Sequence, residues 1–412
     1  MTDAIQHRLE PQEWMAAPAT RRVLAALEAQ GQRVRFVGGC VRDALLGLPV
    51  NDVDIATPDP PERVIALLEE ARLKVVPTGV DHGTVTAVAA GQPFEITTLR
   101  RDEETFGRHA RVAFTDDWKA DAARRDFTMN ALSCDAAGRI WDYFGGVADA
   151  RAGRVRFVGS ARQRIAEDYL RLLRFFRFLA RYGRGEPDGE ALAAAVEAAP
   201  ELARLSGERV RDELLKLLAA PEPVPTLSLM HQHRILASEL PEAGPPDRLS
   251  CLLTLDHAAD TLLRLAALLD CDEQGAATVV QRLRLSNAQR DRLILLRTRP
   301  RPVRPDMEPR ALRRTLYRFG VDAVRELLLL ATAEEGWGAE ALDSARKQVD
   351  AWLPRSFPLK GRDLLAVGAD RGPELGRLLH DLEAWWIEGD FSADHAALLT
   401  EAQRRLRSGD PS

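Results

Sequence analysis

Cysteine is scarce in this chain of 412 residues, which has only four, at Cys40, Cys134, Cys251 and Cys271. They are scattered and form no CxxC pair, which argues against a disulfide scaffold or a zinc ribbon and favours a reducing compartment. The longest apolar runs, such as residues 327–331, are far shorter than the roughly 18–20 residues that span a bilayer. Residues 1–15 lack an apolar core and predict no export signal. We therefore expect a cytoplasmic protein with no membrane partner.

No excess of one charge stands out either, because 57 Lys and Arg residues face 62 Asp and Glu residues, for a net charge of −5. This balance alone gives no reason to expect a nucleic-acid partner, although a local segment can differ from the total. With 45% hydrophobic and 29% charged residues, the composition excludes a fibrous or wholly disordered chain. The length predicts about two to four packed domains.

The apolar pattern changes near residue 150. Before it, helical segments alternate with β-rich runs at 34–37, 53–56, 74–76, 84–89 and 94–99. After it, nearly every segment has a 3.6-residue period, including one continuous run over 162–182. These patterns predict an α+β fold, with a mixed sheet and helices at the N-terminus and an elongated all-α body after them.

Two glycines, Gly38 and Gly39, follow the first β-rich run and open a helix with the sequence GGCVRD. Glycines let a backbone approach a phosphate closely, and the N–H groups at a helix start attract an anion. Arg42 lies in the first turn and is placed to reach the same phosphates. Taken alone, however, the motif is also explained by an ordinary strand–turn–helix connection.

Ten residues after Arg42, a strand-like DVDI segment carries Asp52 and Asp54. Alternate residues of a strand share a face, so both carboxylates project together, and such a pair favours Mg²⁺ with substrate phosphates as further ligands. Glu95, in a later strand-like run, is a candidate third carboxylate that aids the metal or accepts a proton from an attacking hydroxyl. The alternative for Glu95 is a surface residue on an edge strand.

The segment RRDFTMNA at 124–131 supplies adjacent arginines, Arg124 and Arg125, whose forked donors suit phosphate or ribose oxygens. Phe127, Met129 and Ala131 alternate as in an anchored strand. Two arginines in a row are also common on ordinary protein surfaces.

In order, these motifs resemble the head of the class II tRNA nucleotidyltransferase and bacterial poly(A) polymerase family. The resemblance continues with DYFGG at 142–146, EDYLRLLRFFRF at 167–178 and LSGERV at 205–210. It implies a nucleotidyltransferase-type sheet and the transfer of nucleotides from CTP or ATP to a tRNA 3′-hydroxyl. It also implies two Mg²⁺ ions held by Asp52 and Asp54 as catalytic ligands, with Glu95 beside them.

The same resemblance implies that a protein helix, not a nucleic-acid template, selects the nucleotide. Asp168 and Arg171 would hydrogen-bond the base edge, with Arg174 and Arg177 nearby, all at a spacing of three residues. Further nucleotide contacts are implied for Gly38, Gly39, Arg42 and Arg125. The alternative for the helix is an amphipathic surface with an ion pair between Asp168 and Arg171.

Two positions depart from the family pattern. Tyr169 replaces a usual proline, which a helix accommodates easily. The segment 100–117 resembles the flexible loop of the family but carries Phe106 where Asp is common, which puts a loop-dependent switch from C to A addition in doubt. The presence of the loop still disfavours an enzyme that adds only CC.

A tract of twelve arginines between 282 and 318 is opposed within the tract only by Asp291, Asp306 and Glu308. A basic helical tract in an acidic chain predicts binding to the phosphates of an RNA body. Solvated arginine-rich helices are the alternative. The predicted RNA contacts are Arg290, Arg292, Arg297, Arg313 and Arg314.

We therefore expect a CCA-adding tRNA nucleotidyltransferase, with tRNA, CTP and ATP as partners and no obligate protein partner. The expected domains are a nucleotidyltransferase head (1–150), a nucleotide-selecting neck (151–220), a helical body (221–305) and a tRNA-binding tail (306–412). The alternatives are a bacterial poly(A) polymerase, an enzyme that adds only the terminal A, and an inactive RNA-binding module.

Overall fold

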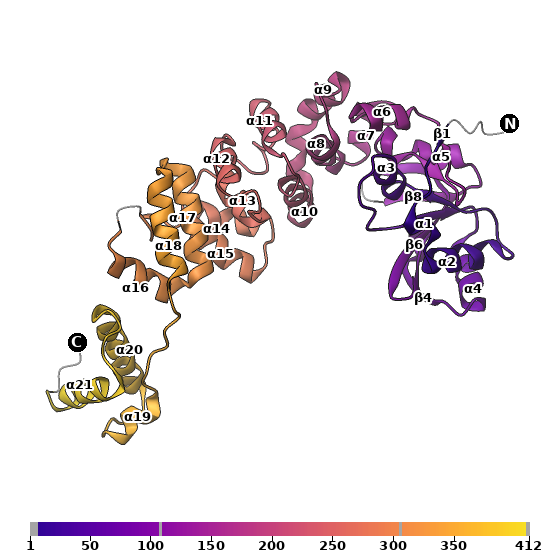
Figure 1. Cartoon of the computed structure of the whole chain (residues 1–412). Coiled ribbons are helices and arrows are strands. Elements are labelled where there is room, and N and C mark those ends of the chain that lie inside the picture. The colour runs from indigo at the N-terminus through magenta and orange to yellow at the C-terminus, as the bar shows by residue number, and fades with distance from the viewer. Residues whose placement is uncertain (1–6, 107–108, 305–306, 409–412) are drawn as a thin grey trace. The chain divides into compact units, whose positions relative to one another are not determined.

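The computed structural model describes residues 7–106, 109–304 and 307–408 (Figure 1). The chain divides into two compact units. The first contains residues up to 246 together with 282–284, and the second contains 247–281 and the residues from 285 onward. The α+β class predicted from the sequence is confirmed, because the sheet lies in the first unit and the described elements of the second are helices. The finer division into four domains stays a prediction.

Eight of the described strands form one mixed sheet in the order β1–β10–β9–β2–β3–β6–β5–β4. Strands β3 and β6 pair in parallel, whereas the other neighbours pair antiparallel. The strands are β1 (His7–Arg8), β2 (Arg35–Val37), β3 (Asp54–Thr57), β4 (Lys74–Gly79), β5 (Thr84–Ala89), β6 (Gln92–Thr98), β9 (Ser133–Cys134) and β10 (Arg139–Trp141).

The segment predicted as a flexible loop contains a separate hairpin of β7 (Arg100–Phe106) and β8 (His109–Phe114). Gly107, Arg108 and the side chain of Phe106 lie outside the described part of the structure, so the consequence of Phe106 stays open.

Helices α2 (Pro18–Glu28) and α4 (Pro61–Glu70) pack side by side against β4 and β5 (Figure 1). In β5, buried Val85 and Ala87 alternate with half-buried threonines, so one face of the strand enters the core. Val23 and Leu27 of α2 are four residues apart and enter the same core. Burying each large apolar side chain contributes roughly 1.5–3 kcal/mol, and this core fixes the strands that carry the site.

The rest of the first unit is mainly helical. Its helices are α1 (Glu13–Ala16), α3 (Gly39–Leu45), α5 (Trp118–Ala123), α6 (Gly146–Ala152), α7 (Ala161–Glu167), α8 (Leu170–Tyr182), α9 (Gly189–Ala198), α10 (Gly207–Leu218) and α11 (Val224–Gln232). The buried side of α8, with Leu172, Leu173 and Phe176, packs where α10 and α11 contact this helix.

Two local predictions are wrong. The run over 162–182 is not one helix, because Asp168 adopts an extended conformation with φ −155° and ψ 108° and separates α7 from α8. The RRDFTMNA segment is not a strand: Thr128–Asn130 form a 3₁₀ turn, and Phe127 makes an isolated bridge with Phe157. In both places an aspartate accepts a hydrogen bond from a nearby backbone N–H group, Asp168 from Leu170 and Asp126 from Phe127, and so competes with the regular pattern.

The second unit contains α12 (Asp247–Leu255), α13 (Thr261–Leu268), α14 (Glu273–Arg282, whose last residue belongs to the first unit), α15 (Asn287–Arg297), α16 (Pro309–Phe319), α17 (Val321–Glu335), α18 (Ala339–Asp350), α19 (Gly361–Ala366), α20 (Pro373–Glu388) and α21 (His395–Ser408). Among the described residues of the whole chain, no helix combines the length and apolar character needed to cross a membrane.

Candidate active site

A turn of two glycines joins β2 to α3 and forms part of a cavity in the first unit. Gly38 has φ +72°, a left-handed conformation that glycine adopts without steric cost. A Cβ on Gly38 would lie 3.1 Å from Nη1 of Arg125, and a Cβ on Gly39 would lie 3.6 Å from Nη2 of Arg42. The turn therefore holds both predicted phosphate-binding arginines against the glycine backbone.

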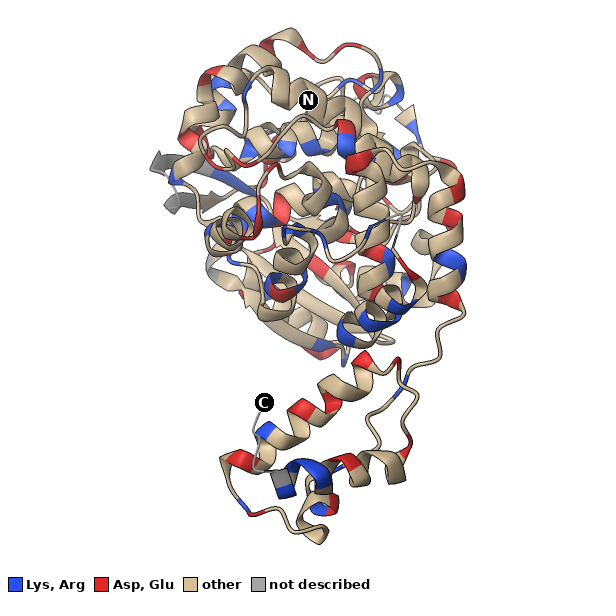
Figure 2. Cartoon of the chain, turned by 90° about the vertical axis from the view of Figure 1, so that its left-hand side faces the viewer, with Lys and Arg blue, Asp and Glu red and all other residues tan. Residues whose placement is uncertain are grey.

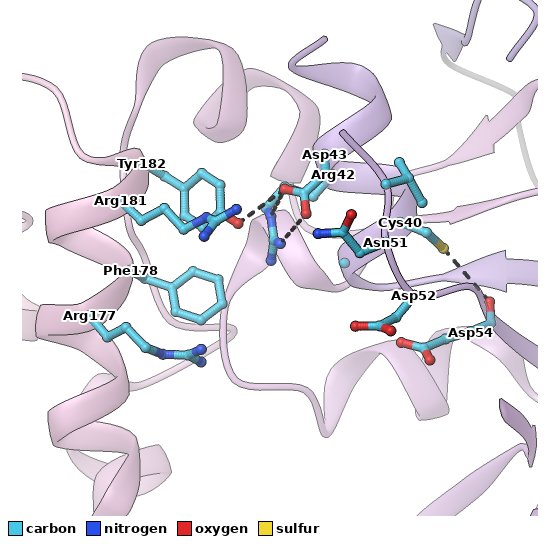
Figure 3. A pocket seen from close by; sticks show the side chains of 12 residues that line it. Cys40, Arg42, Asp43, Asn51, Asp52, Asp54, Arg177, Phe178, Arg181 and Tyr182 are labelled. Atoms are coloured by element: carbon cyan, nitrogen blue, oxygen red, sulfur yellow. Dashed lines mark hydrogen bonds and ion pairs between the residues drawn. The ribbon is translucent and has the colours of Figure 1, made fainter. Parts of the chain in front are cut away.

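Asp52 and Asp54 lie on the same side of this cavity, as the strand pattern predicted. Asp52 lies two residues before β3, and Asp54 is the first residue of the strand. Their carboxylates are side by side in Figure 3, while Val53 and Ile55 between and after them are buried. The cavity has a volume of about 290 Å³, and the last turn of α8 lines the side opposite the aspartates.

Glu95 is brought to Asp54 by the parallel pairing of β3 and β6, in which the two residues are direct partners. Its side chain is exposed, as that of Asp52 is. Burial is the main reason that the pKa of Asp54 rises to about 6; Glu95 and Asp52 add to the rise, and Arg125 opposes it. The predicted third carboxylate is thus a neighbour of the pair.

This donor set fits a hard divalent cation. Burial and two neighbouring carboxylates disfavour the negative charge of Asp54. A cation bound between the carboxylates would stabilise that charge. Among the described residues, no group of three or more His, Cys, Asp or Glu side chains is placed to hold a metal ion. The oxygen donors that fit are therefore those of Asp52 and Asp54.

Arg42 is buried and already engaged. Its Nε and Nη2 donate to the two carboxylate oxygens of Asp43, both at 2.9 Å, and its Nη1 donates to Oδ1 of Asn130 at 2.5 Å. The hydroxyl of Tyr182 donates to Oδ1 of Asp43 at 3.0 Å. These bonds tie the end of α8 to α3, next to the glycine turn (Figure 3).

The RRDFTMNA segment provides a second connection between the glycine turn and α8. Asn130, which accepts from Arg42, donates to Asp126 at 3.0 Å, and Asp126 accepts from Nε of Arg174 at 2.8 Å. Burial alone would raise the pKa of Asp126, but Arg174 and the hydrogen bonds lower it, so the group is an anion. Arg125 donates to Asp121 at 3.2 Å.

The DYFGG segment has a structural role. Asp142 accepts from the backbone N–H groups of Phe144, Gly146 and Val147 at 2.9–3.1 Å and so closes the turn that opens α6. A Cβ on Gly146 would lie 2.1 Å from the carbonyl oxygen of Thr128, which no side chain allows. This close approach fixes the 3₁₀ turn that carries Asn130.

The predicted nucleotide-selecting residues do not form one helical stripe. Asp168 lies in the break before α8 and pairs with Arg209 of α10 at 2.7 Å, not with Arg171. Arg171 pairs with Glu167 at 2.5 Å, and Arg177 pairs with the buried Glu213 of α10 at 2.8 Å. These three side chains are thus engaged by partners on α7 and α10.

The cavity itself therefore gathers Gly39, Arg42, Asp52, Asp54 and Arg177 from the predicted set. Gly38, Arg125 and Glu95 adjoin it, whereas Asp168, Arg171 and Arg174 are not among its lining residues.

Sequence reasoning missed five contributors to this site. Asp43, Asp126 and Asn130 lie inside the recognised motifs, so their polar character was available as a signal. Arg181 and Tyr182 lie just beyond the EDYLRLLRFFRF motif at 167–178 and gave none.

The arginine tract of the second unit differs from its prediction at Arg297. This side chain is 1% exposed; it donates to the carbonyl oxygen of Cys271 at 2.9 Å and pairs with Glu334 of α17 at 2.6 Å. The prediction that Arg297 contacts RNA is wrong, because the guanidinium lies in the core of the unit.

The other four predicted RNA contacts also have partners. Arg292 pairs with Glu326 and Asp260, Arg313 with Asp390, Arg290 with Asp291, and Arg314 donates to the carbonyl oxygen of Glu388. Acidic and basic positions are interspersed along the last helices, near the C label in Figure 2. Whether these four arginines contact RNA stays a prediction.

Two family profiles match the first unit. The profile of the poly(A) polymerase head domain matches residues 34–156, and a profile described as a probable RNA and SrmB binding site of polymerase A matches residues 186–244.

Whole-chain relatives agree with these profiles. The mitochondrial CCA tRNA nucleotidyltransferase 1 of Mus musculus is 33% identical over 395 residues, covering 90% of this chain and 86% of the relative. The CCA-adding enzyme of Limosilactobacillus fermentum is 31% identical over 94% of this chain and 97% of its own. The crystal structure of the Bacillus stearothermophilus CCA-adding enzyme in complex with CTP matches with a TM-score of 0.76 and 28% identity, over 95% of this chain and 99% of the other. With the glycine turn, the paired aspartates and the ordered motifs in place, the chain belongs to the family of CCA-adding tRNA nucleotidyltransferases.

Proposed function

We propose that this chain adds CCA to the 3′ end of tRNA from CTP and ATP without a nucleic-acid template, releasing pyrophosphate. The observation that carries the proposal is the single cavity that Asp52 and Asp54 share with the glycine turn and the end of α8. Phosphoryl transfer requires carboxylates that bind metal, a backbone that phosphates can approach closely and nearby positive charge, here on a helix. The relatives named CCA-adding enzymes support the choice of substrate.

In this reaction the 3′-hydroxyl oxygen of the tRNA forms a bond to the α-phosphorus, and the bond from that phosphorus to the bridging oxygen of pyrophosphate breaks. Asp52 and Asp54 would hold two Mg²⁺ ions, which lower the pKa of the hydroxyl and neutralise the leaving pyrophosphate. Glu95, beside Asp54, is placed to accept the proton of the hydroxyl. Arg125, against Gly38, orients the nucleotide phosphates.

Nucleotide selection falls to Asp168 and Arg171 in this proposal. A carboxylate and a guanidinium offer an acceptor and donors to a base edge, which is what discrimination of C and A from other bases requires. The pairs with Arg209 and Glu167 hold the two side chains in place and limit their rotation. Arg174 and Arg177 extend the same positive surface toward the nucleotide.

The remaining parts of the proposal concern location and architecture. We place the reaction in the cytoplasm, as the cysteine pattern predicted, although some relatives are mitochondrial by name. The head, neck, body and tail boundaries given above are kept as proposed domains. The tRNA body would contact the neck and the exposed arginines of the tract.

A single set of assays tests the proposal. Purified chain and Mg²⁺ receive tRNA transcripts that end before CCA, after C or after CC, each with CTP, ATP or both, and Asp52→Ala serves as the inactive control. Addition of CCA followed by a stop is the expected result. One A added only to the CC end, or an untemplated ladder of A, would replace the proposal by an A-adding enzyme or a poly(A) polymerase. RNA binding without incorporation would leave an RNA-binding module.

A further inference from the structure

The end of α8 carries an arginine that the motifs did not include. Arg181 lines the cavity opposite Asp52 and Asp54, and its side chain is exposed. It lies 5.5 Å from the ring centroid of Tyr182 and extends to the cavity side of the helix in Figure 3. No hydrogen bond or ion pair joins Arg181 to another residue in the described part of the chain.

Its neighbours around the cavity differ from it in this respect. Arg42 is held by Asp43 and Asn130, Arg125 by Asp121, and Arg177 by Glu213. Each of these cations is at least partly neutralised by an anion of the protein itself. Arg181 alone among the arginines that line the cavity keeps all its donors for something that enters.

The last turn of α8, which carries Arg181, is nevertheless anchored. The next residue, Tyr182, donates its hydroxyl to Asp43 at 3.0 Å, and its ring lies 4.3 Å from the guanidinium carbon of Arg42. These contacts anchor the last turn of α8 to α3 and hold Arg181 at the rim of the cavity. An unpaired guanidinium on an anchored helix turn, across the cavity from two carboxylates, is suited to a ligand that carries negative charge and brings cations with it.

We propose that Arg181 binds the phosphates of the incoming nucleoside triphosphate. The inference rests on the function proposed above, because the triphosphate is the anion that must lie between the aspartates and α8. It deepens that proposal by assigning a phosphate contact to a residue outside the recognised motifs. Since the triphosphate is common to CTP and ATP, Arg181 contributes equally to the binding of both and takes no part in choosing between them.

The test compares Arg181→Gln with Arg33→Gln. The control makes the same change at an exposed arginine two residues before β2, at the end of this strand that is opposite to the glycine turn. Binding of CTP, ATP and inorganic pyrophosphate with Mg²⁺ is measured by titration calorimetry without RNA, and tRNA binding is measured separately. Because a hydrogen bond between charged groups contributes substantially to binding, we expect Arg181→Gln to weaken the binding of all three phosphate ligands by about 10- to 100-fold. Arg33→Gln should match the wild type, and Arg181→Lys should recover part of the loss.

Three results would overturn the inference. Unchanged nucleotide binding in Arg181→Gln with weaker tRNA binding would assign the residue to the RNA. Weaker binding of only one of CTP and ATP would assign it to the base. Weaker binding with a lowered melting temperature, shared by Arg181→Lys, would reduce it to a structural residue. If the wild type binds both nucleotides but adds none to tRNA, the proposed function fails while the comparison still decides the role of Arg181.

Discussion

The arginines of the first unit and those of the tract at 282–318 look alike in sequence but have different surroundings. Around the cavity, Arg42, Arg125 and Arg177 each meet one carboxylate, and Arg181 meets none among the described residues. In the second unit, Glu334 alone accepts from four arginines, which are Arg248, Arg297, Arg299 and Arg301. Arg42, Arg177 and Arg181 of the first group line a cavity, whereas in the tract Arg297 and Arg301 are buried in the interior.

The difference teaches that a count of charges along a segment does not measure the charge of a surface. Within 282–318 the acids are few, but Glu326 and Glu334 reach the tract from α17, and Asp390 reaches it from the connection between α20 and α21. Arg297 and Arg301 are 1% and 2% exposed and bind backbone carbonyls as well. Arginine there joins helices, whereas at the cavity Arg181 keeps its donors for a ligand.

The largest expected effect is at the cavity. Because bound metal contributes several kcal/mol to the transfer and roughly 1.4 kcal/mol is a factor of ten in rate, Asp54→Asn should lower nucleotide incorporation by about 10³-fold or more. Its melting temperature should not fall, because the pKa of Asp54 shows that burial disfavours its charge. Glu69→Gln, an exposed change on α4, is the control. Retained activity in Asp54→Asn would remove the aspartate pair from the mechanism.

The second-largest expected effect is a loss of stability on removing the charge of Glu334, which pairs with arginines of the tract. Glu334→Gln leaves Arg297 and Arg301 buried without their anion, and breaking such a pair costs about 3–5 kcal/mol. We expect the melting temperature to fall by about 10 °C, measured by calorimetry on the full chain, with nucleotide binding at low temperature unchanged.

Glu335→Gln provides a matched control next to it, because that side chain is 46% exposed and 4.0 Å from Arg301. A contact this long, made by a carboxylate open to solvent, contributes little, so its change should be within about 0.5 kcal/mol. Equal effects of the two variants would contradict the inward role of the tract.

Acid should reveal the same carboxylate. Burial alone would raise the pKa of Glu334, but hydrogen bonds from Arg301 and Arg299 and the nearby charges hold it well below its ordinary value. A pKa lower in the folded than in the unfolded chain gives stability that is complete above the unfolded value of about 4.3 and is lost as the pH falls below it. The wild type should therefore lose about 1–2 kcal/mol more between pH 5 and pH 3 than Glu334→Gln. Parallel pH profiles from calorimetry would show that Glu334 is not the titrating group.

Local sequence patterns predict much of this contrast, but they do not reveal contacts between residues that are far apart in the sequence. The runs that form β2 to β6 follow from the period-two pattern, although Asp52 lies two residues before β3, and the ordered motifs predicted the family. The break at Asp168 was missed because Leu170, Leu172 and Leu173 continue the helical period across it. The partners Glu213 and Glu334 lie 36 and 37 residues from Arg177 and Arg297, a separation that no local pattern can read.

Tyr182→Phe is expected to have a modest effect at the cavity. The change keeps the ring beside Arg42 and removes one hydrogen bond to Asp43, which is worth about 0.5–1.5 kcal/mol. As a positioning residue for Arg181, Tyr182 should then affect the KM for CTP and ATP together, by about 2- to 10-fold, with kcat nearly unchanged. Steady-state incorporation of CTP into tRNA that ends before CCA, and of ATP into CC-ended tRNA, gives KM and kcat for each nucleotide. A lower melting temperature with an unchanged KM would make the hydroxyl purely structural.

The smallest effect concerns RNA and compares two arginines within the tract. Arg290 is exposed and pairs at 2.9 Å with one exposed carboxylate, Asp291, whereas Arg292 is held by both Asp260 and Glu326. If exposed members of the tract contact tRNA phosphates, Arg290→Gln should weaken tRNA binding by about 2- to 5-fold and reduce the salt dependence of log K by about 0.9. Arg292→Gln should leave that salt dependence unchanged, because its charge is already neutralised. Binding measured at several salt concentrations distinguishes the two. An equal change of slope in both variants would mean that RNA displaces the carboxylates, and the contrast between the two regions would then hold only for the free protein.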